Sequence, residues 1–118
     1  MEIDVGGKKD VQLRLEIADS FWQRFLGLMG RKKLARGTGL LLAPCNSIHM
    51  CFMRFSIDAV YIDKEYRVLK VVRDLRPWIG ISWCPKAWAV IEMNAGEVAR
   101  YGLEKDMILH TKKVTDWP

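Results

Sequence analysis

The sequence predicts one small, mainly β domain, folded as a β-barrel or a jelly-roll-like sandwich with one short helix in its N-terminal half. Three observations predict this class. The chain has 118 residues, which fits a single domain over residues 1–118. Hydrophobic residues make up 50% of it, which is enough apolar material for a core. Several short β-type runs are separated by turn residues, and a single early segment shows helical spacing.

The first part of the chain predicts a strand, a helix and a second strand. Residues 11–17 alternate strictly between apolar and polar side chains, which is typical of a half-buried strand. Asp19 or Ser20 then offers a cap for a helix whose apolar residues recur at helical spacing up to Met29. The run 39–43 is apolar throughout, so it predicts a buried strand.

The rest of the chain predicts further strands joined by turns. We expect a hairpin turn at 63–66, a loop with proline and glycine breakers at 76–85, and a helical turn at 97–101. The expected strands of this part cover residues 56–62, 67–75, 87–93 and 107–113. Short strands interrupted in this way are typical of barrels and sandwiches.

Composition excludes several classes of protein. The N-terminal residues lack the apolar region and small-residue cleavage site of a signal peptide. No apolar run reaches the roughly 18 residues that a membrane-spanning helix needs. The three cysteines are an odd number, which fits a reducing compartment better than a disulfide framework. We therefore expect a cytoplasmic protein that does not use a membrane.

The positive charge of the chain has two interpretations. A net charge of +5 and a pI of about 9.3 are compatible with nucleic acid or an acidic partner, but a modest lysine excess gives the same values. The basic run 31–36 is typical of a solvated helical face, and no RNA-reading or helix-turn-helix motif accompanies it. Nucleic acid is therefore not the expected partner.

The most individual chemical feature is the segment 45–53, which holds two cysteines, a histidine and two methionines. Read as a strand, this segment places Cys45, His49 and Met53 on one face, and read as a helix it places the same three on one stripe. Thiolate, imidazole and thioether together suit copper, and thiolate with imidazole suits zinc. An alternative metal site therefore consists of Cys45, His49 and Met53, with Cys84 as the thiol from elsewhere in the chain.

Geometry limits this metal hypothesis. Residues four apart lie about 13 Å apart in a strand, too far to share an ion, and about 6 Å apart in a helix. The simpler interpretation is packed sulfur atoms around one hydrogen-bonded histidine, so no metal or cofactor is expected. A nucleophilic Cys45 or Cys51 with His49 as its base is a third interpretation, although no glycine-rich oxyanion loop accompanies them.

Two acidic residues, Asp58 and Glu92, interrupt apolar strands. If their faces point inward, both carboxylates need partners, and Arg54, Arg76 and His49 are the available cations. The structural interpretation is a buried ion pair or a hydrogen-bonded turn anchor. The functional interpretation is an acid that lines a pocket.

The loop at 76–85 places Trp78 and Trp83 near the guanidinium of Arg76. These rings could form the floor of a ligand pocket by stacking, or they could fix the loop to the core.

Several sequence blocks together resemble a known family. The blocks are Arg-Phe-Leu-Gly-Leu-Met-Gly-Arg at 24–31, Gly-Leu-Leu-Leu at 39–42, Cys-Asn-Ser-Ile-His at 45–49, Phe-Met-Arg-Phe-Ser-Ile-Asp at 52–58, Leu-Arg-Pro-Trp at 75–78, Val-Ile-Glu-Met at 90–93 and Ala-Gly at 95–96. In this order they resemble the bacterial and archaeal family called domain of unknown function 192, or DUF192, over about residues 11–114. The resemblance implies a compact β-barrel or jelly-roll-like domain with one short helix and no established activity.

The resemblance also separates typical from untypical positions. The Cys-x-x-x-His spacing of Cys45 and His49 belongs to only part of the family, which counts against a metal role shared by all members. Met50 and Cys51 stand where a threonine and an aromatic residue are more usual, and residues 104–106 lack a glycine that is often found there. The positions most typical of the family are Arg24, Gly27, Leu28, Met29, Met53, Asp58, Glu92 and Gly96.

These observations lead to one main hypothesis and two alternatives. We expect a non-catalytic β domain that binds an unidentified small molecule or protein, as a monomer or homodimer. Its ligand site is expected near His49, Met53, Asp58, Arg76, Trp78 and Glu92. One alternative is a metal-binding or redox protein that uses Cys45, His49 and Met53. The other is an enzyme of unassigned class that uses Asp58, Glu92, or Cys45 with His49.

Overall fold

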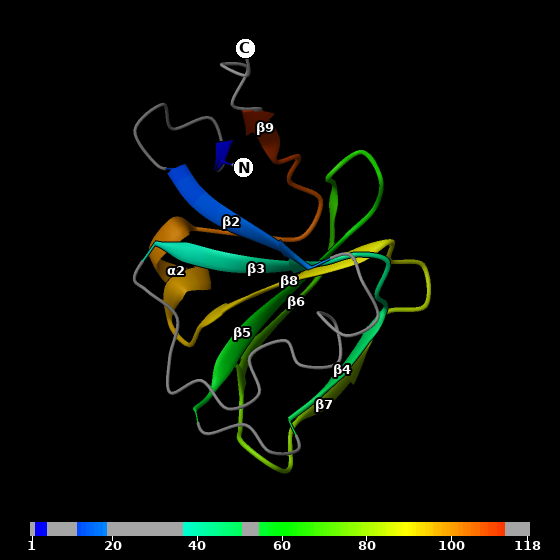
Figure 1. Ribbon diagram of the computed structural model, residues 1–118, viewed down its shortest axis with the longest axis vertical. Helices are drawn as coiled ribbons and strands as arrows, with labels where there is room; N and C mark the ends of the chain where they lie inside the picture. The colour runs from blue at the N-terminus through cyan, green and yellow to red at the C-terminus, as the bar shows by residue number, and fades with distance from the viewer. Residues whose placement is uncertain (1, 5–11, 19–36, 51–54, 113–118) are drawn as a thin grey trace.

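The computed structural model describes residues 2–4, 12–18, 37–50 and 55–112, which form a seven-stranded sheet and a two-stranded ribbon (Figure 1). A single helix, α2 (Glu97–Tyr101), lies in these ranges. The strands in chain order are β1 (Glu2–Asp4), β2 (Gln12–Ala18), β3 (Thr38–Leu42), β4 (Ser47–His49), β5 (Ile57–Ile62), β6 (Val68–Leu75), β7 (Ile81–Trp83), β8 (Ala89–Asn94) and β9 (His110–Lys112).

The large sheet has the strand order β6-β5-β8-β3-β2-β1-β9, and the ribbon pairs β4 with β7. β2 and β3 run parallel, and the other paired strands of the described ranges are antiparallel. An isolated β-bridge pairs Arg67, just before β6, with Ile108, which precedes β9, but β6 and β9 form no continuous ladder. The mainly β, sandwich-like expectation is therefore confirmed, and the sheet does not close into a barrel.

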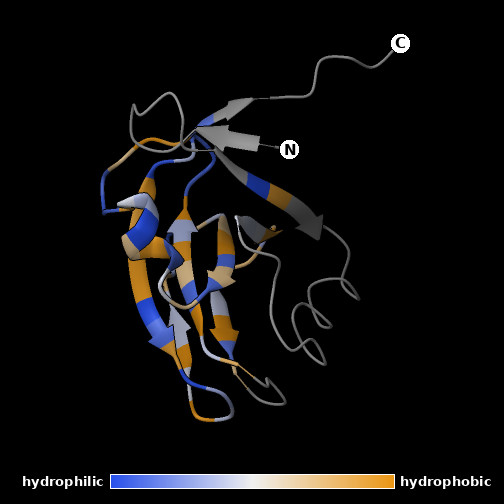
Figure 2. Cartoon of the chain, turned by 90° about the vertical axis from the view of Figure 1, so that its left-hand side faces the viewer, coloured by the Kyte–Doolittle hydropathy of each residue, from blue (hydrophilic) through white to orange (hydrophobic). Residues whose placement is uncertain are grey.

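The central strands of the large sheet are buried on both faces. All six residues of β5 are buried, and so are the first five of β8. Because successive side chains of a strand point to opposite faces, Val60 and Ile62 of β5 belong to one core, and Ala59 and Tyr61 belong to the other. Figure 2 shows the corresponding hydrophobic stretches along the strands of the sheet.

Different elements close the two cores. The first core, on the side of Val60, is closed by Val98 of α2 and by Leu103 and Leu109 of the segment that follows. The second core, on the side of Tyr61, is closed by the ribbon, which contributes Ile48, and by Met50 just beyond it. The ribbon is therefore a second layer over one face of the sheet (Figure 1).

Most expected elements are confirmed within two residues. β2, β3, β5, β6 and β8 match five expected strands, and α2 matches the expected helical turn at 97–101. β1 was not expected. The early helix expected from Asp19 or Ser20 onward falls in the range 19–36, outside the described residues. No helix within the described ranges is long and apolar enough to cross a membrane.

The expected loop at 76–85 is wrong in its middle, where β7 pairs with β4. Ser82 is buried there, whereas Ile81 and Trp83 are exposed. This order is the reverse of the usual apolar-inward alternation, and three residues between breakers give too little periodicity to reveal a strand. Within the described residues 45–50 of the sulfur-and-histidine segment, the strand covers Ser47–His49.

Candidate functional site

Asp58 is buried near the start of β5 and binds backbone amides. Its Oδ1 accepts a hydrogen bond from Asp74 N at 2.9 Å, and its Oδ2 accepts from Gly96 N at 2.9 Å and Val98 N at 3.1 Å. Gly96 has a φ of 94°, a left-handed conformation that suits glycine. The carboxylate thereby holds the end of β6 and the start of α2 onto β5, which is a hydrogen-bonded turn anchor.

Glu92 is 7% exposed and lies on the other face of the sheet. In the register of β8, Glu92 pairs with Ala59, while its neighbour Met93 pairs with Asp58. Asp58 and Glu92 therefore point to opposite faces and do not share one site. Within the described ranges no residue donates a hydrogen bond to the Glu92 carboxyl group or forms an ion pair with it. Burial raises the pKa of Glu92 to about 7.

The other expected ligand residues lie at the ribbon. His49 is exposed on the outer face of β4, opposite Ile81. Arg76 and Trp78 are exposed in the turn before β7. Met53 falls in the range 51–54, outside the described residues. The expected set is thus divided among three places: the ribbon and the two faces of the sheet.

The ribbon exposes large apolar side chains that sequence reasoning only partly identified. Trp78 is 59% exposed, Ile79 76%, Ile81 64% and Trp83 58%. We call these four residues the outer ribbon face. Trp78 was an expected ligand residue and Trp83 was noted beside it, but Ile79 and Ile81 were missed. The missed signal is the alternation of Ile81, Ser82 and Trp83, which becomes meaningful once Ser82 is known to point inward.

Ser82 is the inward anchor of the ribbon. Its hydroxyl lies 2.6 Å from Tyr61 Oη of β5, inside the second core. Burial raises the pKa of Tyr61 to about 12, with smaller contributions from nearby Cys45, Cys84 and Glu92, while the bond to Ser82 opposes the shift. This buried bond fixes which side of β7 faces the sheet, so Ile81 and Trp83 face outward.

The turn before β7 is tightly built around Trp78. Trp78 has a φ of 70°, a left-handed conformation that costs a non-glycine residue about 1–3 kcal/mol. Its N–H donates to Met50 O at 2.7 Å, and Gly80 N donates to Arg76 O at 3.0 Å. A Cβ at Gly80 would lie 2.7 Å from Met50 Cγ, so this position requires glycine. The turn therefore holds Trp78 and Ile79 at the surface in a defined conformation.

Cations border the outer ribbon face. Lys70 Nζ donates to Trp83 O at 2.9 Å and lies 5.9 Å from the centre of the Trp83 ring. This distance is within the range of a cation–π contact. Arg76 is exposed two residues before Trp78. The surface thus combines apolar side chains with positive charge.

The cysteine–histidine pair does not converge in the described structure. Cys45 packs against the second core, and its Sγ donates to Ser47 O at 3.1 Å. His49 instead points outward from β4. Among the described residues no three His, Cys, Asp or Glu side chains are grouped to hold a metal ion. The metal hypothesis remains a prediction, because its third residue, Met53, lies outside these ranges.

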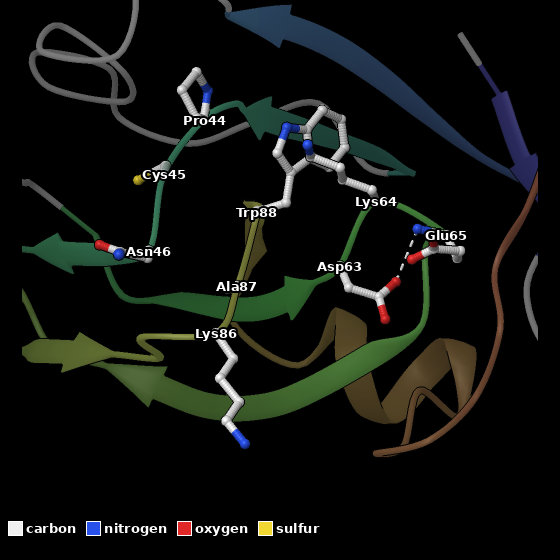
Figure 3. Close-up of a pocket in the computed structure, with 9 residues that line it drawn as sticks. All are labelled: Pro44, Cys45, Asn46, Asp63, Lys64, Glu65, Lys86, Ala87 and Trp88. Atoms are coloured by element: carbon white, nitrogen blue, oxygen red, sulfur yellow. Dashed lines mark hydrogen bonds between the residues drawn. The ribbon is translucent and has the colours of Figure 1, made fainter.

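A pocket of about 550 Å³ opens at one end of the sheet; of the residues expected at a site, Cys45 lines it, and none of the six expected ligand residues does (Figure 3). Three segments line it, residues 44–46, 63–65 and 86–88. They follow β3, follow β5 and precede β8, and these three strands are neighbours in the sheet. Sequence reasoning missed this pocket because its parts are distant along the chain.

Comparison with known sequences assigns the chain to a family. The sequence model of the DUF192 family, described as uncharacterized, matches residues 1–111. The chain belongs to the DUF192 family. The resemblance of its sequence blocks to that family is therefore confirmed, and the family carries no assigned activity.

Curated relatives of this DUF192 chain are named UPF0127 proteins. The relative from Pyrococcus horikoshii is 41% identical over 80 residues, covering 64% of this chain and 65% of its own length. The relative from Pyrococcus furiosus is 32% identical over 81 residues, covering 64% and 67%. The relative from Thermococcus sibiricus is 38% identical over 91 residues, covering 72% and 57%. The match thus spans about two-thirds or less of each relative.

Two solved structures share the fold of the DUF192 chain. A protein of unknown function from Novosphingobium aromaticivorans has a TM-score of 0.81 and 21% identity, covering 93% of this chain and 84% of its own. A candidate transcription regulator from Sinorhizobium meliloti has a TM-score of 0.82 and 23% identity, covering 92% and 89%. At this level of identity the likeness shows the fold alone.

Proposed function

We propose that this DUF192 domain is a non-catalytic binding module. Its outer ribbon face binds a segment of a protein partner that carries both acidic and apolar residues. The observation that carries the proposal is the exposure of four large apolar side chains close together in the chain: Ile81 and Trp83 on the outward side of β7, and Trp78 and Ile79 in the turn before it. Tryptophan is typical of the centre of a binding interface.

The extent of the face favours a peptide-sized partner. The four side chains expose on the order of 500 Å² of surface, close to the largest apolar patch of an ordinary monomer, and such patches are often functional. A stable homodimer generally buries about 800 Å² or more on each side. The outer ribbon face alone is smaller than that, so it fits one extended segment better than a second copy of the chain.

Charge favours an acidic partner. Lys70 and Arg76 border the face, and the whole chain carries a net charge of +5. An acidic segment would be steered toward this surface, and its apolar residues would bury the exposed rings. A basic segment would meet like charges at the border of the interface.

The backbone supports a role beyond folding for this surface. Trp78 keeps a left-handed backbone conformation while its side chain is 59% exposed. Because this side chain is not buried in the core, no hydrophobic burial offsets the energetic cost of the strained backbone. Strain of this kind clusters at binding sites, where the surrounding structure holds it in place.

Selection of peptides from a random phage-displayed library tests the proposal. The library is selected on the wild-type domain and counter-selected on the double variant Ile79→Ser, Trp83→Ser. We expect enriched peptides that combine Asp or Glu with aromatic or aliphatic residues. Ile108→Ser is the matched control, because Ile108 is 44% exposed but lies outside the outer ribbon face.

Two outcomes would contradict the proposal. One is enrichment of peptides that bind the double variant as well as the wild type. The other is tight binding of phosphatidylglycerol vesicles at physiological ionic strength that the double variant loses, because this would assign the face to an anionic membrane instead of a protein.

A further inference from the structure

The pocket lined by residues 44–46, 63–65 and 86–88 is independent of the outer ribbon face. Its volume of about 550 Å³ lies within the range of small-molecule sites, which is roughly 300–1,000 Å³. Since β3, β8 and β5 are adjacent in the sheet, the three lining segments lie beside one another at the same end of these strands (Figures 1 and 3). Its position at the ends of packed strands gives the pocket a rigid base.

Asp63 supplies a fixed carboxylate in this pocket. Its Oδ1 accepts hydrogen bonds from Glu65 N and Arg67 N, both at 2.9 Å, and its own N–H donates to Arg67 O at 3.1 Å. The turn thus holds the carboxylate in one orientation while using only Oδ1. Within the described part of the chain Oδ2 makes no further hydrogen bond, so it is available to a ligand donor.

Trp88 supplies a fixed apolar wall. Its ring packs edge-on against Tyr66, with centroids 5.9 Å apart and an interplanar angle of 61°. The backbone N–H of Trp88 donates to Ile62 O at 2.9 Å, and its backbone carbonyl accepts from Cys45 N at 2.8 Å. Both the backbone and the ring of Trp88 are therefore held before any ligand arrives, which lowers the entropic cost of binding.

The rim carries both signs of charge. Lys64 and Glu65 project from the turn after β5, and Lys86 projects from the loop before β8 (Figure 3). With Asp63, the lining holds two cations and two anions. A ligand with a single charge would meet a like charge on this rim, whereas a ligand with both charges can pair each one.

We propose that this pocket binds a small zwitterion with an apolar body, such as a free amino acid. The ammonium group binds the Asp63 carboxylate, the carboxylate group binds Lys64, and the apolar body packs on the Trp88 ring. Charge-assisted hydrogen bonds of this kind are the stronger class of polar contact. No bond is made or broken in the ligand.

Three matched probes test this inference by NMR titration of the ¹⁵N-labelled domain. L-phenylalanine carries both charges, 3-phenylpropionate lacks the ammonium group, and 2-phenylethylamine lacks the carboxylate. We expect saturable shifts of the amides at 63–66 and 87–88 with L-phenylalanine in the millimolar range. Each single-charge probe should bind at least about tenfold more weakly, since it loses one charge-assisted contact.

Two variants test whether L-phenylalanine binds in this pocket. Lys64→Met should weaken L-phenylalanine binding by about tenfold. Lys105→Met, at an exposed lysine outside the pocket, should leave it unchanged. These substitutions are on the surface, so both proteins should fold. Equal affinity for the three probes, an absence of saturable shifts with L-phenylalanine, or shifts confined to other residues would each overturn the inference.

Discussion

The large sheet and the ribbon differ in which of their side chains are buried and which are exposed. In β5 every side chain is buried, including Asp58 and Tyr61, and each contributes to one of two cores or to an internal anchor. In β7 the buried side chain is a serine, and the large ones, Ile81 and Trp83, are exposed. Folding therefore accounts for the side chains of β5 but not for the outward ones of β7. The unexplained apolar surface is where a partner is expected.

Within the sheet, Asp58 and Glu92 show a second contrast. Both are buried carboxylic acids on neighbouring strands, but Asp58 accepts three backbone hydrogen bonds, whereas Glu92 accepts none from the described residues. Burial alone therefore does not determine the role of an acidic side chain. Its hydrogen-bond partners determine that role as well. Asp58 anchors the backbone of two neighbouring elements, whereas burial raises the pKa of Glu92.

Loss of the Asp58 anchor should have the largest effect on stability. Asp58→Ala removes the acceptor for three backbone N–H groups in a buried site, so we expect a loss of at least about 3 kcal/mol in the free energy of unfolding. Urea denaturation measures it. Asp58→Asn, which keeps an acceptor oxygen, should lose less. A change below about 1 kcal/mol in Asp58→Ala would show that the anchor is not structural.

Glu92 should make stability depend on pH. Its pKa is about 7 when folded and 4.5 in a solvent-exposed chain. Between these values the folded state binds more protons than the unfolded state, so stability falls as pH rises from 4.5 to 7 and is level above that range. The difference corresponds to about 3 kcal/mol for the whole range.

Glu92→Gln provides the control for this pH dependence. The amide does not titrate, so the variant should lose most of the decline between pH 4.5 and 7 when unfolding is followed in urea at several pH values. It should also be more stable than the wild type at pH 8, where the wild type carries a buried charge. The same decline in both proteins would assign it to other groups.

The bond between Tyr61 and Ser82 should contribute moderately, since it joins the ribbon to the sheet. Tyr61→Phe removes the phenol oxygen and leaves the Ser82 hydroxyl buried without this partner. We expect a loss of about 1–2 kcal/mol in the free energy of unfolding. Thermal unfolding of Tyr61→Phe beside Ser82→Ala and the double variant measures the coupling. Strictly additive effects would mean that the two groups do not interact.

The outer ribbon face should contribute least to stability. Ile79→Ser and Trp83→Ser alter side chains that are 76% and 58% exposed, so each should change the free energy of unfolding by less than about 1 kcal/mol. Equilibrium unfolding in urea measures both. A loss above about 2 kcal/mol in either variant would mean that the contrast between the sheet and the ribbon is wrong.

The sequence predicted the sheet better than the site. A strictly alternating run predicted β2 and a wholly apolar run predicted β3, because the pattern of apolar residues in a strand records which faces are buried. The sequence also suggested a turn anchor as one role for Asp58. It did not separate Asp58 from Glu92, because the face that each occupies depends on the register of β5 against β8. β7 and the pocket were missed for the same reason, since both depend on pairing between distant segments.

The affinity of a selected acidic peptide for three forms of the domain tests the central claim most directly. The forms are the wild type, the double variant Ile79→Ser, Trp83→Ser, and the control Ile108→Ser, measured by isothermal titration at one ionic strength. We predict that the double variant binds at least about 30-fold more weakly than the wild type while the control binds equally well, and that all three have similar unfolding temperatures. Equal affinity of the folded double variant and the wild type would contradict it.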